Sequence, residues 1–163
     1  MHIITPGRTI GPVLFLGGNM LKGIDPLISP DLLMVLAQMG HGDELVIADA
    51  NFPAESVAES SVYGAALRMD CDAPRAVAAV LSLLPVDDYE PDPVLTMQVV
   101  GDPQAVPDVV AEAEPQFAKA GTRSASLERF AFYERARGAF AVLRTAETRA
   151  YGNFILRKGV VAG

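Results

Sequence analysis

The stretch over residues 29–48 constrains the fold most strongly, because the signals of a helix are followed there at once by those of a strand. Ser29 is suited to cap a helix, and Pro30 suits the first helical position. Apolar residues then recur at helical spacing, and Gly40 is suited to a left-handed stop. Residues 44–48 are a short, mostly apolar run that is typical of a buried strand. The sequence therefore predicts a helix, a tight turn and a strand in succession.

The same alternation continues along the chain. Asp72 is suited to cap a second helix, and Pro115 implies a kink in a third. The predicted segments are helices over residues 72–84, 107–119 and 130–137, and strands over residues 94–100, 139–143 and 154–156. This order indicates an α/β domain with three αβα layers around a largely parallel or mixed central sheet.

The composition narrows the classes of ligand and compartment. With a net charge of −7 the chain lacks the clustered Lys and Arg that neutralise phosphates, so we expect no nucleic-acid partner. Its one cysteine, Cys71, excludes an intrachain disulfide and suits the reducing cytoplasm. Two histidines do not make the kind of cluster that zinc sites use. We therefore expect a cytoplasmic protein without a bound metal.

The apolar runs and the length bound the organisation of the chain. No apolar run approaches the ~20 residues of a membrane-spanning helix, and no secretory signal is recognised, so we expect no membrane partner. A chain of 163 residues is expected to form a single domain. A nucleotide-binding α/β domain would need a glycine-rich phosphate loop, and the glycines near the N-terminus lack the lysine and the strand context for one.

Two ionisable side chains bracket the strand predicted over residues 44–48. His41 lies between two glycines before the strand, and Asp49 follows it at the carboxyl end, where α/β sheets usually bind ligands. Glycine leaves room for a ligand beside an imidazole. A lone histidine in a turn is also typical of a solvated residue, and an aspartate after a strand often caps a loop. From the residues alone both interpretations stay open for each side chain.

Two further segments carry polar groups that could bind a sugar. Arg129 and Tyr133 are four residues apart and would share a face of the helix predicted there, where they could grip sugar hydroxyls or simply cover an apolar surface. Tyr151 and Asn153 flank a glycine before the last predicted strand, a pattern that by itself indicates only a turn.

Four ordered segments together resemble the L-fucose mutarotase and D-ribose pyranase family (RbsD/FucU). They cover residues 20–24, 27–53, 129–136 and 151–160. Between residues 56 and 116 the resemblance is confined to residues 84–89 and 99–102. The RFAFYERA segment over residues 129–136 resembles the fucose branch more than the ribose branch. Asn51 departs from those members that have a histidine there.

The resemblance implies a sugar mutarotase domain over residues 20–163, with residues 1–19 as an N-terminal extension outside it. It implies that His41 is the catalytic histidine, with Tyr133 and Tyr151 as further catalytic candidates. It implies that four residues bind the substrate: Asp49, Arg129, Tyr151 and Asn153. Tyr151 would thus have both roles. It further implies L-fucose as the sugar, no cofactor, and a homo-oligomer such as a decameric ring.

The chemistry of these residues agrees with the mutarotase function that the resemblance implies. Anomer exchange requires one group to protonate the ring oxygen while another accepts the proton of the anomeric hydroxyl, and a histidine can do either near neutral pH. Two alternatives within the resemblance remain open: a non-catalytic sugar-binding or transport-accessory protein, and a D-ribose pyranase.

Overall fold

The computed structural model describes residues 20–163, so the extension predicted over residues 1–19 lies outside the described residues. Eleven helices and strands follow one another in this part of the chain: α1 (Pro30–Gln38), β1 (Glu44–Ala48), α2 (Ala54–Ala58), β2 (Ala66–Met69), α3 (Ala73–Leu81), β3 (Val94–Met97), α4 (Asp108–Lys119), β4 (Ala125–Leu127), α5 (Arg129–Arg137), β5 (Ala141–Thr145) and β6 (Phe154–Arg157). Within this part no helix is long and apolar enough to cross a membrane.

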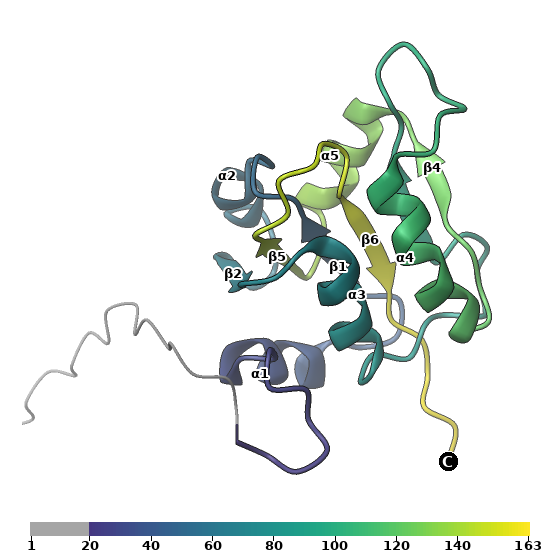
Figure 1. The fold of residues 1–163 in the computed structure, drawn as a ribbon. Helices are drawn as coiled ribbons and strands as arrows, with labels where there is room; N and C mark the ends of the chain where they lie inside the picture. The colour runs from purple at the N-terminus through teal and green to yellow at the C-terminus, as the bar shows by residue number, and fades with distance from the viewer. Residues whose placement is uncertain (1–19) are drawn as a thin grey trace, which may run out of the picture.

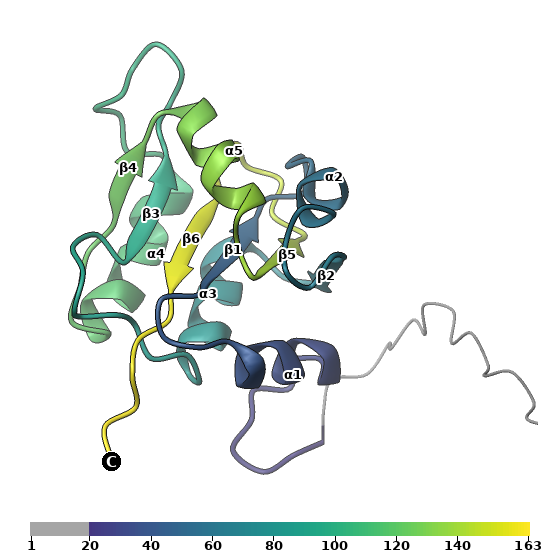
Figure 2. The ribbon, with the colours of Figure 1, turned by 180° about the vertical axis from the view of Figure 1, so that it is seen from behind.

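The six strands form one mixed sheet in the order β2-β5-β1-β6-β3-β4. β1, β2 and β5 are mutually parallel, and β3 is parallel to β4. β6 is antiparallel to both of its neighbours, β1 and β3. The carboxyl ends of five strands therefore meet at one end of the sheet, called here the carboxyl end, together with the start of β6. The opposite end, called the amino end, holds the starts of those five strands and the end of β6 (Figure 2).

Helices cover both faces of the sheet, which confirms the predicted three layers. α3 and α4 lie on one face (Figure 1), and α2 and α5 on the other (Figure 2). The strand β1 shows why two apolar layers are needed: Leu45 and Ile47 belong to the core under α3 and α4, whereas Val46 and Ala48 belong to the core under α2 and α5. Successive strand residues point to opposite faces, so a central strand with helices on both sides is apolar throughout.

Local capping explains where the predicted helices begin. The Ser29 hydroxyl accepts a hydrogen bond from the Leu32 amide at 3.1 Å, and the Asp72 carboxylate accepts one from the Arg75 amide at 2.9 Å. Each cap satisfies an amide that has no partner within the helix. The sequence predicted both caps correctly.

Other boundaries differ from the prediction. The left-handed residue after α1 is Gly42, with a φ of 86°, and not Gly40. The side chain of Lys158 instead donates to the Leu36 and Met39 carbonyls at the end of α1, which explains how that helix terminates without a left-handed glycine. The helix predicted to reach residue 84 ends at Leu81. The elements α2, β2 and β4 were not predicted.

Candidate functional site

The predicted site residues divide between the two ends of the sheet. His41 precedes β1 at the amino end. Asp49, Arg129, Tyr151 and Asn153 come from segments at the carboxyl end, where β1 and β4 finish and β6 begins. The five residues of β1 span roughly 16 Å at about 3.3 Å per residue. One copy of the chain therefore does not bring His41 together with the other predicted residues.

Asp49 and Asn153 lock the loops at the carboxyl end to each other. The Asp49 amide donates to Oδ1 of Asn153 at 2.9 Å, and Nδ2 of Asn153 donates to Oδ2 of Asp49 at 3.1 Å. Oδ1 of Asp49 also accepts from the amides of Asn51 and Phe52, at 3.0 and 2.8 Å. Both residues are 4% exposed. The pair thus holds residues 49–53 against the turn that leads into β6.

The environment of Asp49 has opposing effects on the pKa of its carboxyl. Burial raises the pKa of the Asp49 carboxyl above its usual value, while the hydrogen bonds from Asn51, Phe52, Asn153 and Gly152 oppose that rise. A buried carboxyl with these partners has the loop-capping role that the sequence left open. Its predicted contact with a sugar stays a prediction.

The turn at residues 151–153 is shaped by close packing. Tyr151 has a φ of 65°, a conformation that non-glycine residues seldom adopt. A Cβ atom on Gly152 would lie 2.8 Å from Cγ of Glu147 and 3.3 Å from a methyl group of Val109, so only glycine fits without movement. In this turn the Tyr151 hydroxyl accepts a hydrogen bond from the Val100 amide at 3.2 Å. The turn therefore fixes the position of a phenol oxygen.

A hollow of about 290 Å³ lies beside that phenol. It is lined by Gln98, Val99, Val100, Gly101, Pro103, Glu128, Arg129 and Phe130. The Arg129 guanidinium lies 4.7 Å from the centre of the Phe130 ring, and the Phe130 side chain is largely exposed. The hollow thus offers a cation and apolar surface close to the Tyr151 hydroxyl, a combination that can bind a small polyhydroxylated ligand.

Tyr133 has a different setting from Arg129, although both belong to α5. Its ring stacks on Phe52, with the ring centres 5.4 Å apart and an angle of 22° between the planes. Neither Tyr133 nor Tyr151 lines the hollow itself, but the Tyr151 hydroxyl is hydrogen-bonded to Val100, which does line it. The proposed catalytic role of Tyr133 is therefore supported less by this geometry than that of Tyr151.

At the amino end, His41 is held by a buried carboxylate that the sequence analysis did not single out. Nε2 of His41 lies 3.0 Å from Oδ1 of Asp87. The Asp87 side chain is 1% exposed, whereas that of His41 is 45% exposed. Oδ2 of Asp87 accepts from Nε of Arg157 at 2.8 Å, and Oδ1 also accepts from the Tyr89 amide at 3.1 Å. The resemblance over residues 84–89 is the one signal that could have directed attention to Asp87.

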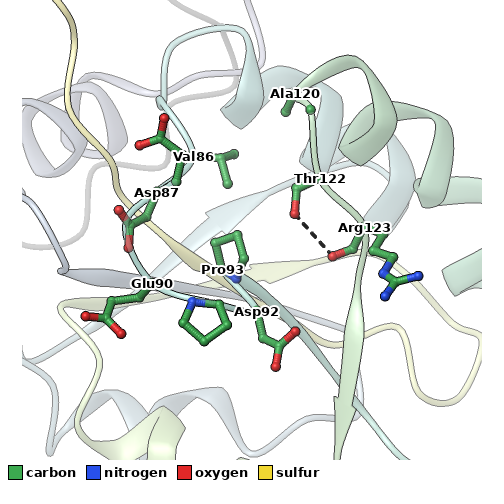
Figure 3. A pocket seen from close by; sticks show the side chains of 11 residues that line it. Val86, Asp87, Glu90, Asp92, Pro93, Ala120, Thr122 and Arg123 are labelled. Carbon is green, nitrogen blue, oxygen red and sulfur yellow. Dashed lines mark hydrogen bonds between the residues drawn. The ribbon is translucent and has the colours of Figure 1, made fainter.

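A second pocket, of about 340 Å³, is lined in part by the loop that carries Asp87. In Figure 3, Glu90 and Asp92 lie along one side and Thr122 and Arg123 along the other. None of the predicted site residues lines this pocket. Within residues 20–163, no three His, Cys, Asp or Glu side chains are grouped so that they could hold a metal ion.

Comparison with known proteins gives matches over most of the chain. A sequence model of the RbsD / FucU transport protein family matches residues 22–161. The fucose mutarotase of Homo sapiens is 47% identical over 148 residues, which are 87% of this chain and 95% of that protein. The crystal structure of FucU from Bifidobacterium longum is 42% identical with a TM-score of 0.75, and the match covers 86% of this chain and 100% of that one. The structure of the fucose mutarotase from Streptococcus pneumoniae in complex with L-fucose is 38% identical with a TM-score of 0.77, covering 87% and 100%.

Proposed function

The chain belongs to the RbsD / FucU transport protein family, and we propose that it is an L-fucose mutarotase, an isomerase that interconverts the α and β anomers of the free sugar. Two lines of similarity support this substrate: the human relative is a fucose mutarotase, and a solved neighbour holds L-fucose. The resemblance of residues 129–136 to the fucose branch supports the same substrate.

The observation that carries the proposal is the geometry around Tyr151. Its hydroxyl oxygen accepts from the Val100 amide, so the phenol proton is left to point elsewhere, and the hollow with Arg129 lies beside it. A hydroxyl held in this way can donate a proton to a ring oxygen, and a guanidinium can orient sugar hydroxyls through charge-assisted hydrogen bonds. Ring opening of a pyranose needs both a proton donor at the ring oxygen and a group that orients the sugar.

The reaction then proceeds by paired proton transfers. Tyr151 gives a proton to the ring oxygen as the bond from that oxygen to the anomeric carbon breaks. His41 takes the proton of the anomeric hydroxyl, which becomes the aldehyde oxygen. After rotation about the adjacent carbon–carbon bond, the reverse transfers close the ring on the other face. No redox step or group transfer is involved, so the chemistry of these side chains suffices.

This scheme needs two copies of the chain, because His41 and Tyr151 lie at opposite ends of the sheet. The proposal is that the amino end of one copy faces the carboxyl end of the next, so that His41 of one copy completes the hollow of its neighbour. Such a head-to-tail contact is heterologous and closes into a ring when the rotation permits. It fits the homo-oligomer, such as a decameric ring, that the resemblance implies. A cytoplasmic location is part of the same proposal, since the single cysteine suits a reducing compartment.

The test is exchange NMR on the anomers of L-fucose, with and without the protein. Magnetisation transfer between the two anomeric protons should accelerate in proportion to protein concentration. Line broadening or saturation transfer from the protein without faster exchange would instead identify a sugar-binding protein that lacks turnover. D-ribose, measured under the same conditions, should exchange between pyranose and furanose more slowly. An equal or higher rate on ribose would indicate a pyranase and contradict the choice of fucose.

A further inference from the structure

We propose that Asp87 is a positioning residue for His41, which fixes the imidazole in the tautomer that carries its proton on Nε2 and leaves Nδ1 free to meet the sugar. This inference rests on the proposed mutarotase function. The observation that carries it is the contact of 3.0 Å between Nε2 of His41 and Oδ1 of Asp87.

The acceptor side of that contact is fixed by its other partners. Asp87 accepts from the side chain of Arg157 and from the amide of Tyr89, and it is almost completely buried. Burial raises the pKa of the Asp87 carboxyl, but the hydrogen bonds from Tyr89, His41 and Arg157 together hold it well below its usual value. An ionised carboxylate can only accept hydrogen bonds. The nitrogen of His41 that faces it must therefore be the donor.

The orientation of Asp87 is set by hydrogen bonds with Arg157 and with the loop that carries Asp87 itself. Its own amide donates to the Arg157 carbonyl at 3.0 Å, and the Arg157 guanidinium also donates to the Pro91 carbonyl at 2.9 Å. Arg157 is the last residue of β6, a central strand of the sheet. The centres of the Tyr89 and His41 rings lie 5.0 Å apart, so the phenol packs beside the imidazole. The carboxylate is thus anchored to the sheet through Arg157.

This arrangement determines what His41 can do. Within residues 20–163 the structure gives no hydrogen-bond partner to Nδ1 of His41, and the side chain is 45% exposed. A neutral imidazole with its proton on Nε2 presents a lone pair at Nδ1, which can take the proton of the anomeric hydroxyl. The imidazolium formed in that step is stabilised by the adjacent carboxylate, and it returns the proton when the ring closes. Asp87 does not exchange a proton itself.

A purely structural reading competes with this one. In that reading, Asp87 serves only to pair with Arg157, and the imidazole is incidental. The two readings differ in what they predict for the tautomer of His41 and for the turnover of a folded variant.

The first measurement is a long-range ¹⁵N–¹H spectrum of the full, unaltered chain at a pH at which the imidazole is neutral. The sequence has only two histidines, so the signal that disappears in His2→Gln assigns the other to His41. The expected result is a protonated Nε2 and an unprotonated Nδ1. A proton on Nδ1 in the unaltered protein overturns the proposal, and this readout needs neither the sugar nor a variant at Asp87.

The second measurement compares Asp87→Asn with Asp88→Asn, which removes the same charge at the adjacent exposed position. Asp87→Asn should lose the preference for the proton on Nε2. Its kcat for anomer exchange should fall by a factor approaching the ~10²–10⁴-fold that a positioned acid–base group supplies, with KM little changed. Asp88→Asn should keep the tautomer and the rate. A folded Asp87→Asn protein with unchanged tautomer and kcat would refute the inference, whereas an unaltered protein without turnover would refute the proposed function instead.

Discussion

Mixing two inactive variants tests whether each site is built from two copies of the chain. His41→Ala removes the proposed proton acceptor at the amino end, and Tyr151→Phe removes the proposed proton donor at the carboxyl end. Each variant alone should exchange L-fucose roughly 10²–10⁴-fold more slowly, since each lacks one acid–base group. If a site takes His41 from one copy and Tyr151 from the next, a mixed oligomer contains some sites in which both are intact.

The size of the recovery follows from random assembly of the two variants. In an oligomer assembled at random from equal amounts, each contributing copy is suitable with a chance of one half, so about one quarter of the sites are complete. Co-expression of the two variants with different tags, followed by exchange NMR on doubly purified oligomers, measures the rate per chain. Recovery to roughly a quarter of the unaltered rate is expected. No rise above the rates of the separate variants, in oligomers that contain both, would show that the site lies within one copy.

Three further predictions concern the turn, the stability and the N-terminus. Gly152→Ala should lower the free energy of unfolding by about 1–3 kcal/mol in denaturant titrations, because its Cβ would lie 2.8 Å from Glu147, whereas Gly138→Ala, with its nearest neighbour at 3.6 Å, should cost much less. The pKa of Glu147 is lowered to about 2, first by the hydrogen bond from the Arg149 side chain. The ionised carboxylate of Glu147 therefore stabilises the fold fully at pH values above ~4.5, the pKa of a glutamate in the unfolded chain. That contribution disappears as the pH falls towards 2. Urea midpoints at about pH 6 and about pH 3 should then differ less for Glu147→Gln than for the unaltered protein, and an equal difference would contradict this assignment. Deletion of residues 1–19 should leave the exchange rate nearly unchanged, and a large loss in a folded truncation would give that segment a part in the site or the assembly.

The elements that the sequence predicted are those with local signals. Ser29 and Asp72 cap the helices that follow them within three residues, and the apolar run of β1 is recognisable because both of its faces are covered. The elements α2 and β4 have five and three residues, too few to show a period, and they form only because the surrounding structure packs against them. Such elements cannot be recognised from a single sequence.

In the candidate site, too, the sequence predicted what depends on local spacing and missed what depends on tertiary contacts. That His41 and Asp49 lie at opposite ends of one strand followed from their spacing, and the structure confirms it. The contact between His41 and Asp87 joins residues 46 positions apart, which no periodicity reveals. Arg129 and Tyr133 satisfied the spacing rule for a shared helix face, yet Arg129 lines the hollow while Tyr133 stacks on Phe52. Helical spacing gives proximity along the helix, and tertiary packing decides what each side chain meets.

Because β6 is antiparallel to its neighbours, its two ends hold candidate site residues at opposite ends of the sheet. Asn153, just before its start, fastens the loop of Asp49, and Arg157 at its end fastens the carboxylate behind His41. The two anchors are four residues apart, about 14 Å along an extended strand. In the proposed head-to-tail assembly, the length of β6 would therefore set the distance from each proposed catalytic centre to the next. A single inserted residue between the anchors would reverse the facing of one of them, so this distance can change only if two neighbouring centres are rebuilt together.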